Sequence, residues 1–329
     1  MKMIFSIRCI RGMLAFVVGV FATIIYAEPG YPSKSIRLIV GYGAGTAGDI
    51  VARLVANKLQ ESYKHGVVVE NKSGAGGQIA AQETARAAPD GYTLIMGAMP
   101  QFSIAPAVSP RLTYSPLKDF AAVTQVVTTD LALIVNPLKV PATSMREFVN
   151  WAKQQPIVFF GTSGPGTVGH LGAYFLADSA QIKIEPVHFK NTADAMSAMA
   201  GGHLHAWFVP LSVAAPQVKI GKVRVLIVTG ADRASLFPDV PTSRESGYPD
   251  VQFTSWYGVF APAGTPATIL EKLNTDLVNA AKNPDIQSKI EDGGSRVTAT
   301  TREEFSRLIA DDTVRWGKAV KSSGFKIQD

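Results

Sequence analysis

A glycine-rich loop at residues 41–49, GYGAGTAGD, lies between a β-branched run, SIRLIV, and a helical pattern, IVARLVANKL. Gly43, Gly45 and Gly48 spell G-x-G-x-x-G, and a further strand-like run, VVVE, ends at Glu70. Glycine allows the tight turn by which a strand enters a helix and lets the backbone approach a ligand closely. The loop therefore predicts an α/β fold whose strands are joined by helices.

The same alternation of short apolar runs and amphipathic helical patterns continues along the chain. Within about 70 residues the order is β-α-β-α-β, which indicates a parallel sheet. The rhythm starts again near residue 128, and the region after residue 265 is mainly helical. We therefore predict two α/β domains, one discontinuous (28–127 plus 228–329) and one continuous (128–227). The absence of a flexible linker between them is typical of hinged domains.

The first 27 residues differ from the rest of the chain. Lys2, Arg8 and Arg11 are their only charged residues, and the apolar run MLAFVVGVFATIIYA follows. A basic head, a short apolar segment and a small residue at its end are typical of a secretory signal peptide, so we predict cleavage after Ala27 and a periplasmic location. The run is shorter than the about 20 residues that span a bilayer; an uncleaved anchor is the alternative. Cys9, the only cysteine, lies in this segment, so the mature chain has no disulfide and no thiol chemistry.

The charge of the mature chain is small. The whole sequence carries +6, and removal of the signal peptide leaves 29 Lys and Arg against 26 Asp and Glu, a balance of +3. These charges are scattered along the sequence rather than clustered. The pattern argues against nucleic acid as a partner and is compatible with a small anionic ligand.

Two kinds of ligand fit the first glycine loop. Its G-x-G-x-x-G pattern with Glu70 is the dinucleotide-binding signature, so an exported Rossmann-type oxidoreductase is one alternative. Against it, an exported protein meets little NAD, and Asp49 in the first helical turn would repel a pyrophosphate. Glycine-rich turns also precede helical patterns at residues 73–77 and 164–167. Three such turns favour a site lined by several helix N-termini, whose backbone amides would hold a small anion, most simply a carboxylate.

The sequence has no strong catalytic or metal-binding motif. In the stretch GTSGP, Pro165 stands where the nucleophile elbow G-x-S-x-G needs glycine. The H-E-x-x-H and Walker motifs do not occur. His203 and His205 would share one face of a strand near His188, but a zinc site needs a further ligand of clear spacing. We therefore predict that the protein is not an enzyme and that it has no metal site and no cofactor.

The longer motifs resemble one family over almost the whole mature chain. Four stretches resemble, in this order, the Bug-type periplasmic solute-binding proteins: YPSKSIRLIVGYGAGTAGDIVARLVANKL, VVVENKSGAGGQIAAQETARAAPDGYTLIMG, GTSGPGTVGHL and LFPDVPTSRESGYPDVQFTSWYGVFAPAGTP. These proteins are the extracytoplasmic receptors of tripartite tricarboxylate transporters. The resemblance implies a type II periplasmic-binding-protein fold, in which two hinged α/β domains close on a small carboxylate held by the glycine-rich loops. It also implies delivery of the ligand to the transporter's membrane components.

We expect such a receptor to be a monomer. A protein with the receptor fold that acts on a signalling partner instead of a transporter is an alternative that the sequence leaves open.

The chain departs from the family pattern within these loops. In the first loop, Pro-Phe-x-Pro-Gly-Gly-x-x-Asp in the family, the departures are Gly41, Ala44 and Thr46. In the third loop Thr167 keeps the hydroxyl of a family serine. Asn191 replaces a glycine and His205 replaces an acid. If these last two positions face the ligand, they would alter its choice.

The predicted ligand-binding residues come from the three loops and from one later turn. In the first domain they are Tyr42, Gly45, Thr46, Ala47, Asp49 and Gly74. In the second domain they are Thr162, Ser163, Gly166, Thr167, His170 and Asn191. We expect Asp49 to orient a water or an uncharged ligand group, because a carboxylate is unfavourable next to a second carboxylate.

Overall fold

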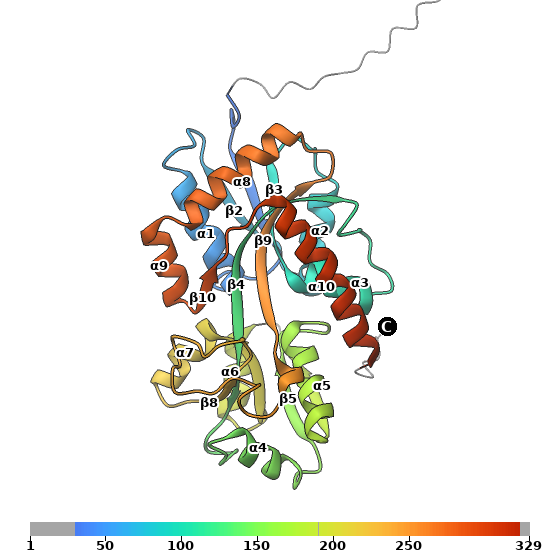
Figure 1. The fold of residues 1–329 in the computed structure, drawn as a ribbon, viewed down its shortest axis with the longest axis vertical. Helices are drawn as coiled ribbons and strands as arrows, with labels where there is room; N and C mark the ends of the chain where they lie inside the picture. The colour runs from blue at the N-terminus through green and yellow to red at the C-terminus, as the bar shows by residue number, and fades with distance from the viewer. Residues whose placement is uncertain (1–29, 190, 323–329) are drawn as a thin grey trace, which may run out of the picture.

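The computed structural model describes residues 30–189 and 191–322, which form two α/β lobes, one above the other in Figure 1. The strands are β1 (Ile36–Val40), β2 (Val67–Asn71), β3 (Thr93–Ala98), β4 (Phe120–Val135), β5 (Val158–Thr162), β6 (Ile184–His188), β7 (Ala206–Pro210), β8 (Arg224–Val228), β9 (Thr254–Pro262) and β10 (Ser295–Val297). The helices are α1 (Ala47–Leu59), α2 (Gln78–Ala85), α3 (Ala105–Val108), α4 (Met145–Ala152), α5 (Val168–Ala180), α6 (Thr192–Ala200), α7 (Leu211–Lys219), α8 (Ala267–Ala281), α9 (Pro284–Asp292) and α10 (Arg302–Ser322). Three short helical segments are η1 (Ala75–Gly77), η2 (Pro100–Ile104) and η3 (Pro249–Val251). The predicted signal peptide, residues 1–27, lies outside the described residues.

The upper lobe is built on a sheet with the strand order β2-β1-β3-β9-β4, and β10 lies beside β4. β1 is parallel to both β2 and β3, as the β-α-β-α-β rhythm predicts, while β9 is antiparallel to β3 and β4. Side chains of β1 alternate between the two faces of the sheet. Leu38 and Val40 belong to the apolar cluster that includes α1 and α8, and Ile39 belongs to the cluster that includes α2 and α10.

Strand β4 is 16 residues long and belongs to both lobes. Its first part pairs with β9, and its last part pairs with β7 and β8. The lower sheet continues from β7 to β5 and β6, which run parallel to one another. The lobes meet near Asp130, which pairs with Thr254 at the start of β9, and Leu131, which pairs with Pro210 at the end of β7.

Strand direction places the carboxyl ends of both sheets at the junction of the lobes. β3 is antiparallel to β9, so β3 and its parallel neighbours run toward the start of β9. β7 is antiparallel to β4, so β7 and the parallel β5 run back toward the same level. The glycine-rich loops that follow β1, β2 and β5 therefore project from the facing ends of the two lobes (Figure 1).

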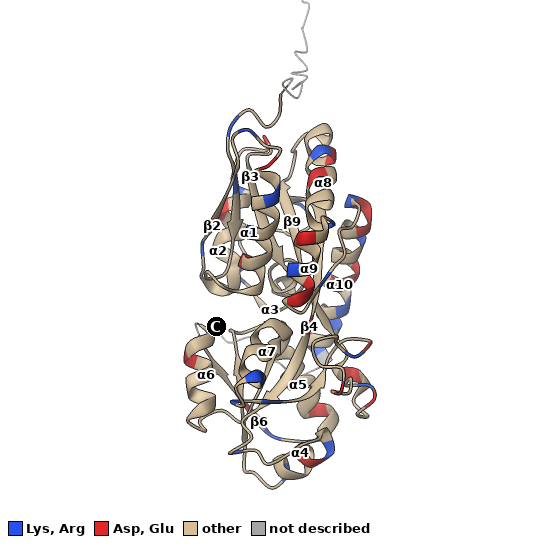
Figure 2. Cartoon of the chain, turned by 90° about the vertical axis from the view of Figure 1, so that its left-hand side faces the viewer, with Lys and Arg blue, Asp and Glu red and all other residues tan. Residues whose placement is uncertain are grey.

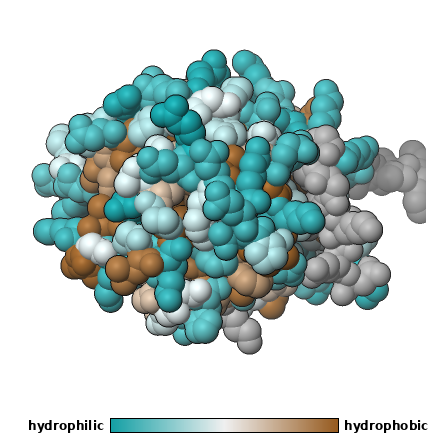
Figure 3. Space-filling model, turned by 90° about the horizontal axis from the view of Figure 1, so that it is seen from below, coloured by the Kyte–Doolittle hydropathy of each residue, from teal (hydrophilic) through white to brown (hydrophobic). Residues whose placement is uncertain are grey.

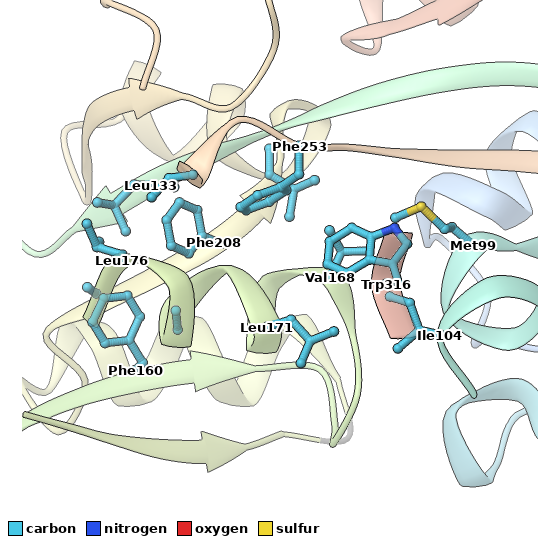
Figure 4. Close-up of a cluster of buried hydrophobic side chains, with 14 of the residues drawn as sticks. Met99, Ile104, Leu133, Phe160, Val168, Leu171, Leu176, Phe208, Phe253 and Trp316 are labelled. Atoms are coloured by element: carbon cyan, nitrogen blue, oxygen red, sulfur yellow. The ribbon is translucent and has the colours of Figure 1, made fainter. Parts of the chain in front are cut away.

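Apolar packing joins the lobes as well as filling them. One cluster lies between the upper sheet and α1, α8 and α9, and another packs α6 and α7 on the lower sheet. The largest cluster runs through both lobes. Figure 4 shows Trp316 of α10 within this cluster, with Val168, Leu171, Met99 and Ile104 among its neighbours.

Charged residues of both signs are interspersed along α8, α9 and α10 (Figure 2). The lower end of the molecule presents mainly hydrophilic side chains with apolar ones between them (Figure 3). Among the residues that the structure describes, no helix combines the length and the hydrophobicity needed to cross a bilayer.

Candidate ligand-binding site

The first glycine loop ends in an uncapped helix. Gly45 has φ of +77°, a left-handed conformation that favours glycine. The Thr46 hydroxyl donates to the Gly43 carbonyl at 2.8 Å, and Thr46 occupies the N-cap position without accepting a hydrogen bond from its own helix. The first main-chain bond within α1 runs from Ile50 N to Thr46 O at 2.9 Å. The amides of the first turn, including that of the predicted residue Ala47, therefore remain available to an external acceptor.

Asp49 holds this loop in shape. Its carboxylate is 2% exposed and accepts hydrogen bonds from the Gly45 amide at 2.9 Å, from Asn71 Nδ2 at 2.8 Å and from Arg53 Nε at 3.1 Å. Burial raises the pKa of Asp49, but the hydrogen bonds from Arg53, Gly45 and Asn71 together outweigh it and hold the pKa below its ordinary value. Asp49 is thus ionised, and Arg53 neutralises its charge. Because the charge of Asp49 is neutralised, Asp49 does not by itself exclude a phosphate from this helix start.

Tyr42 connects the first loop to the second. Its hydroxyl donates to the Gly76 carbonyl at 3.2 Å, and its carbonyl accepts from Asn71 Nδ2 at 3.0 Å. In the second loop every residue from Gly74 to Gly77 has a positive φ, between +46° and +146°. Such a run needs glycine at most positions and turns the backbone amides toward one side.

Gln101, which no sequence motif marks, supports both upper loops. Its side chain is fully buried, donates to the Gly77 carbonyl at 2.7 Å and accepts from the Ala98 amide at 2.8 Å. A Cβ at Gly41 would lie 2.5 Å from Gln101 Nε2, and a Cβ at Gly77 would lie 2.3 Å from the same atom. Gly41 is therefore required for packing against Gln101.

The third loop, in the lower lobe, repeats the construction of the first. Gly166 has φ of +70°, and its amide donates to His170 Nδ1 at 3.0 Å. The Thr167 hydroxyl donates to the Gly164 carbonyl at 2.9 Å, and α5 also begins without a side-chain cap. Ser163 in the same loop is exposed. A Cβ at Gly166 would lie 2.6 Å from Val108 Cγ2, so this loop lies against α3 of the other lobe.

The two helices α1 and α5 therefore start in the same way. Each has 13 residues, and the N-cap residues Thr46 and Thr167 have φ/ψ of −74°/160° and −74°/158°. Each loop is closed by a buried side chain, Asp49 or His170, that accepts the amide of the glycine four residues earlier. The repeated geometry places one uncapped helix N-terminus at the facing end of each lobe.

His170 closes the third loop as a neutral side chain, whereas Asp49 closes the first loop as an anion. It is 3% exposed, and burial, with a smaller effect of His188, lowers its pKa to about 4. In neutral His170 the Nδ1 atom carries a lone pair and accepts the Gly166 amide. The His188 ring stands edge-on to His170 at 5.1 Å between centroids, and its Nδ1 is hydrogen-bonded to the hydroxyl of buried Thr162. Burial lowers the pKa of His188 as well.

We expect stability to fall in mild acid because of His170. The pKa of His170 is about 6.5 in the unfolded chain and about 4 in the folded protein. The contribution of neutral His170 to the unfolding free energy is therefore complete above pH 6.5 and is lost as the pH falls toward 4. Over that window wild type should lose roughly 1–3 kcal/mol more of its unfolding free energy than His170→Asn, whose amide oxygen can still accept the Gly166 amide. Urea unfolding at pH 7, 5.5 and 4.5 measures this, and parallel curves for both proteins would remove the role assigned to His170.

Asn191 and His205 belong to neither of these two helix starts. Asn191 caps α6: its Oδ1 accepts the Asp194 amide at 2.9 Å and its Nδ2 donates to Asp194 Oδ2 at 2.8 Å, so a contact of Asn191 with ligand stays a prediction. His205 lies before β7, where its Nδ1 accepts the Phe159 amide at 3.0 Å and its ring packs against Trp151. This is the end of the lower sheet remote from the junction, so His205 does not face the ligand loops.

Two lobes joined by long strands, with a matching glycine-rich loop and uncapped helix start on each facing end, define a two-domain solute-binding protein. Residues 51–325 match the model of the tripartite tricarboxylate transporter family receptor. BugT of Bordetella pertussis is 30% identical over 322 residues, which cover 96% of this chain and 98% of BugT. The chain belongs to this family of tripartite tricarboxylate transporter receptors, as its resemblance to the Bug-type proteins predicts.

Solved structures confirm the predicted two-domain α/β fold. A protein of R. palustris solved with adipate is 30% identical, with a TM-score of 0.85 over 89% of this chain and 98% of that protein. MatC from Rhodopseudomonas palustris with bound malate is 30% identical, with a TM-score of 0.82 over 88% of this chain and all of MatC. The family assignment supersedes the Rossmann-type oxidoreductase alternative.

Proposed function

We propose that this protein is a periplasmic receptor that binds a small organic carboxylate between its lobes and delivers it to the membrane components of a tripartite tricarboxylate transporter. It catalyses no reaction and acts as a monomer after cleavage behind Ala27. Its hinged domains are residues 28–127 plus 228–329, and residues 128–227, with the second crossing between the lobes placed nearer Thr254, where β9 begins.

The repeated glycine loop is the observation that supports this function most. An anion that contacts the first turn of both α1 and α5 would be attracted by two helix N-termini, each contributing about 0.3–1 kcal/mol when exposed and up to about 2 kcal/mol when partly buried. Because the two loops belong to different lobes, only the closed arrangement offers both sets of amides. The ligand would therefore select the closed state.

The ligand class is supported by the relatives. Malate is bound in MatC, and adipate is bound in the other R. palustris protein. These two relatives, each 30% identical to this chain, thus bind dicarboxylates of different length. We propose a carboxylate for this chain on the same loops. Ala47 would contribute its backbone amide, and Gly45, Gly74 and Gly166 would supply the left-handed turns of their loops. The hydroxyl protons of Thr46 and Thr167 are already donated within their loops, so these two side chains would shape the site.

A thermal-shift screen tests the proposal. At a hundredfold excess over Kd a ligand stabilises the folded state by about 2.7 kcal/mol, which should raise Tm by about 5 °C in a protein of this size. The panel is acetate, succinate, malate, adipate, citrate, benzoate and aspartate, with sodium chloride at matched ionic strength as the control. At least one acid should give this shift. If every acid behaves like sodium chloride, the protein is not a receptor for this class of ligand.

A further inference from the structure

A tyrosine of the central strand β9 covers the start of α1. A Cβ at Gly48, in the first turn of this helix, would lie 2.8 Å from Cε1 and 3.0 Å from Cδ1 of Tyr257. Only glycine at position 48 leaves room for the ring in this place. The Tyr257 ring therefore lies directly on the helical turn whose amides have no capping side chain.

Strand β9 holds this ring in a fixed position. It lies between β3 and β4 in the middle of the upper sheet, and Tyr257 pairs with Ala98 and Val127. The preceding residue, Trp256, is buried on the other face, where its Nε1 donates to Asp312 at 2.8 Å. Tyr257 is only three residues from Thr254, the residue of β9 at the junction of the lobes.

The hydroxyl of Tyr257 is available for a ligand. Tyr257 is partly buried, and its hydroxyl forms no hydrogen bond with the residues that the structure describes. Burial raises its pKa to about 12, so at neutral pH the hydroxyl is protonated and can donate. The neighbouring Tyr42 differs, because its hydroxyl already donates to the Gly76 carbonyl.

We propose that Tyr257 determines specificity in this receptor by donating a hydrogen bond to a carboxylate seated on the first turn of α1. The ring excludes water from one side of the helix start, and the hydroxyl adds a side-chain donor to the backbone amides. A neutral or cationic solute gains nothing comparable from these donors. This inference rests on the proposed function and assigns one side chain to it.

Tyr257→Phe tests the hydroxyl alone, because the ring that packs on Gly48 is kept. For the acid of the panel that gives the largest thermal shift, we expect Kd to rise about ten- to a hundredfold, the range for loss of a hydrogen bond to a charged group. Tyr31→Phe is the matched control, because it also removes one tyrosine hydroxyl. Tyr31 lies at the start of the described chain, and its hydroxyl donates to the Gly91 carbonyl. Its Kd should equal that of wild type.

A double substitution tests the ring contact. Gly48→Ala should weaken binding in the wild-type background, because the new Cβ collides with the ring. In the Tyr257→Ala background the same change should have little further effect on Kd. Equal Kd values for wild type and Tyr257→Phe, with binding of the acid intact in both, would overturn the inference while leaving the proposed function standing. Absence of binding to wild type would instead remove the proposed function.

Discussion

Replacing His170 with aspartate is expected to abolish most carboxylate binding. The substitution places a second loop-closing carboxylate at the start of α5, in the position that Asp49 occupies on α1. On α1 the charge is neutralised by Arg53 four residues later, but on α5 the corresponding residue is Tyr174, whose ring lies 5.3 Å from that of His170. Two unit charges about 6 Å apart repel by roughly 3 kcal/mol at an effective dielectric constant of 20, so Kd should rise at least about a hundredfold.

The repeated construction also predicts how to restore binding. His170→Asp combined with Tyr174→Arg rebuilds on α5 the Asp–Arg pair of α1 and should recover a large part of the lost affinity. Calorimetry with the best acid of the panel measures Kd for both variants, and circular dichroism establishes that both are folded. A folded His170→Asp protein with wild-type affinity would show that α5 does not contact the anion. A folded double variant as weak as the single one would show that the charge is not the cause.

Replacing Asp49 with alanine is expected to cost the most stability of any single change in the loops. The variant leaves the Gly45 amide, the Asn71 amide and the Arg53 guanidinium without their common acceptor. Removing one partner of a buried ion pair costs about 3–5 kcal/mol, although the 47% exposure of the Arg53 side chain favours the lower end. Chemical denaturation measures this loss.

Glu61→Ala is the matched control for the Asp49 experiment. Glu61 pairs with Lys58 at 2.6 Å on the same helix, but its side chain is 65% exposed, so its removal should cost less than about 0.5 kcal/mol. If Asp49→Ala lost no more stability than Glu61→Ala, the carboxylate would not organise the first loop, and the parallel with His170 would be wrong as well.

Much of the fold could be predicted because its determinants are local. The alternation of apolar runs and helical patterns identified the parallel strands β1, β2 and β3 and the largely helical C-terminal region. Glycine spacing identified all three loops, since the positive φ at Gly45, Gly74 and Gly166 favours that residue type. The extent of β4 was not predicted: the run LALIVNP marks only its last part, and its pairing with β9 connects residues far apart in sequence.

The supporting side chains of the site could not be predicted for a related reason. Gln101 lies in η2, a segment without a recognised pattern, and its role arises only because the chain brings Gly41 and Gly77 against it. Asn71 ends β2 and becomes important through its contact with Asp49. In the sequence, Tyr257 lies in an apolar strand pattern, which is typical of an aromatic residue of the core. Gln101 and Tyr257 share one signal, a glycine whose Cβ would collide with the side chain, and this signal becomes visible only once the contact is known.

Some departures from the family pattern have a structural explanation, and others lie where a ligand can reach them. Gly41 is explained by packing against Gln101, and His205 by its place at the remote end of the lower sheet. Ala44 and Thr46 remain as the departures on exposed or partly exposed positions of the first loop. Together with Tyr257 they are the residues at which we expect ligand choice to be set.

Titration calorimetry with an acid and its neutral ester tests the central claim most directly. The protein, exported with its own signal peptide and purified, is titrated with the acid that gives the largest thermal shift and with the methyl ester of the same acid. We predict saturable binding of the acid with one site per chain and no measurable binding of the ester, because the helix N-termini of α1 and α5 recognise negative charge. Equal binding of acid and ester, or binding of neither, would contradict the account.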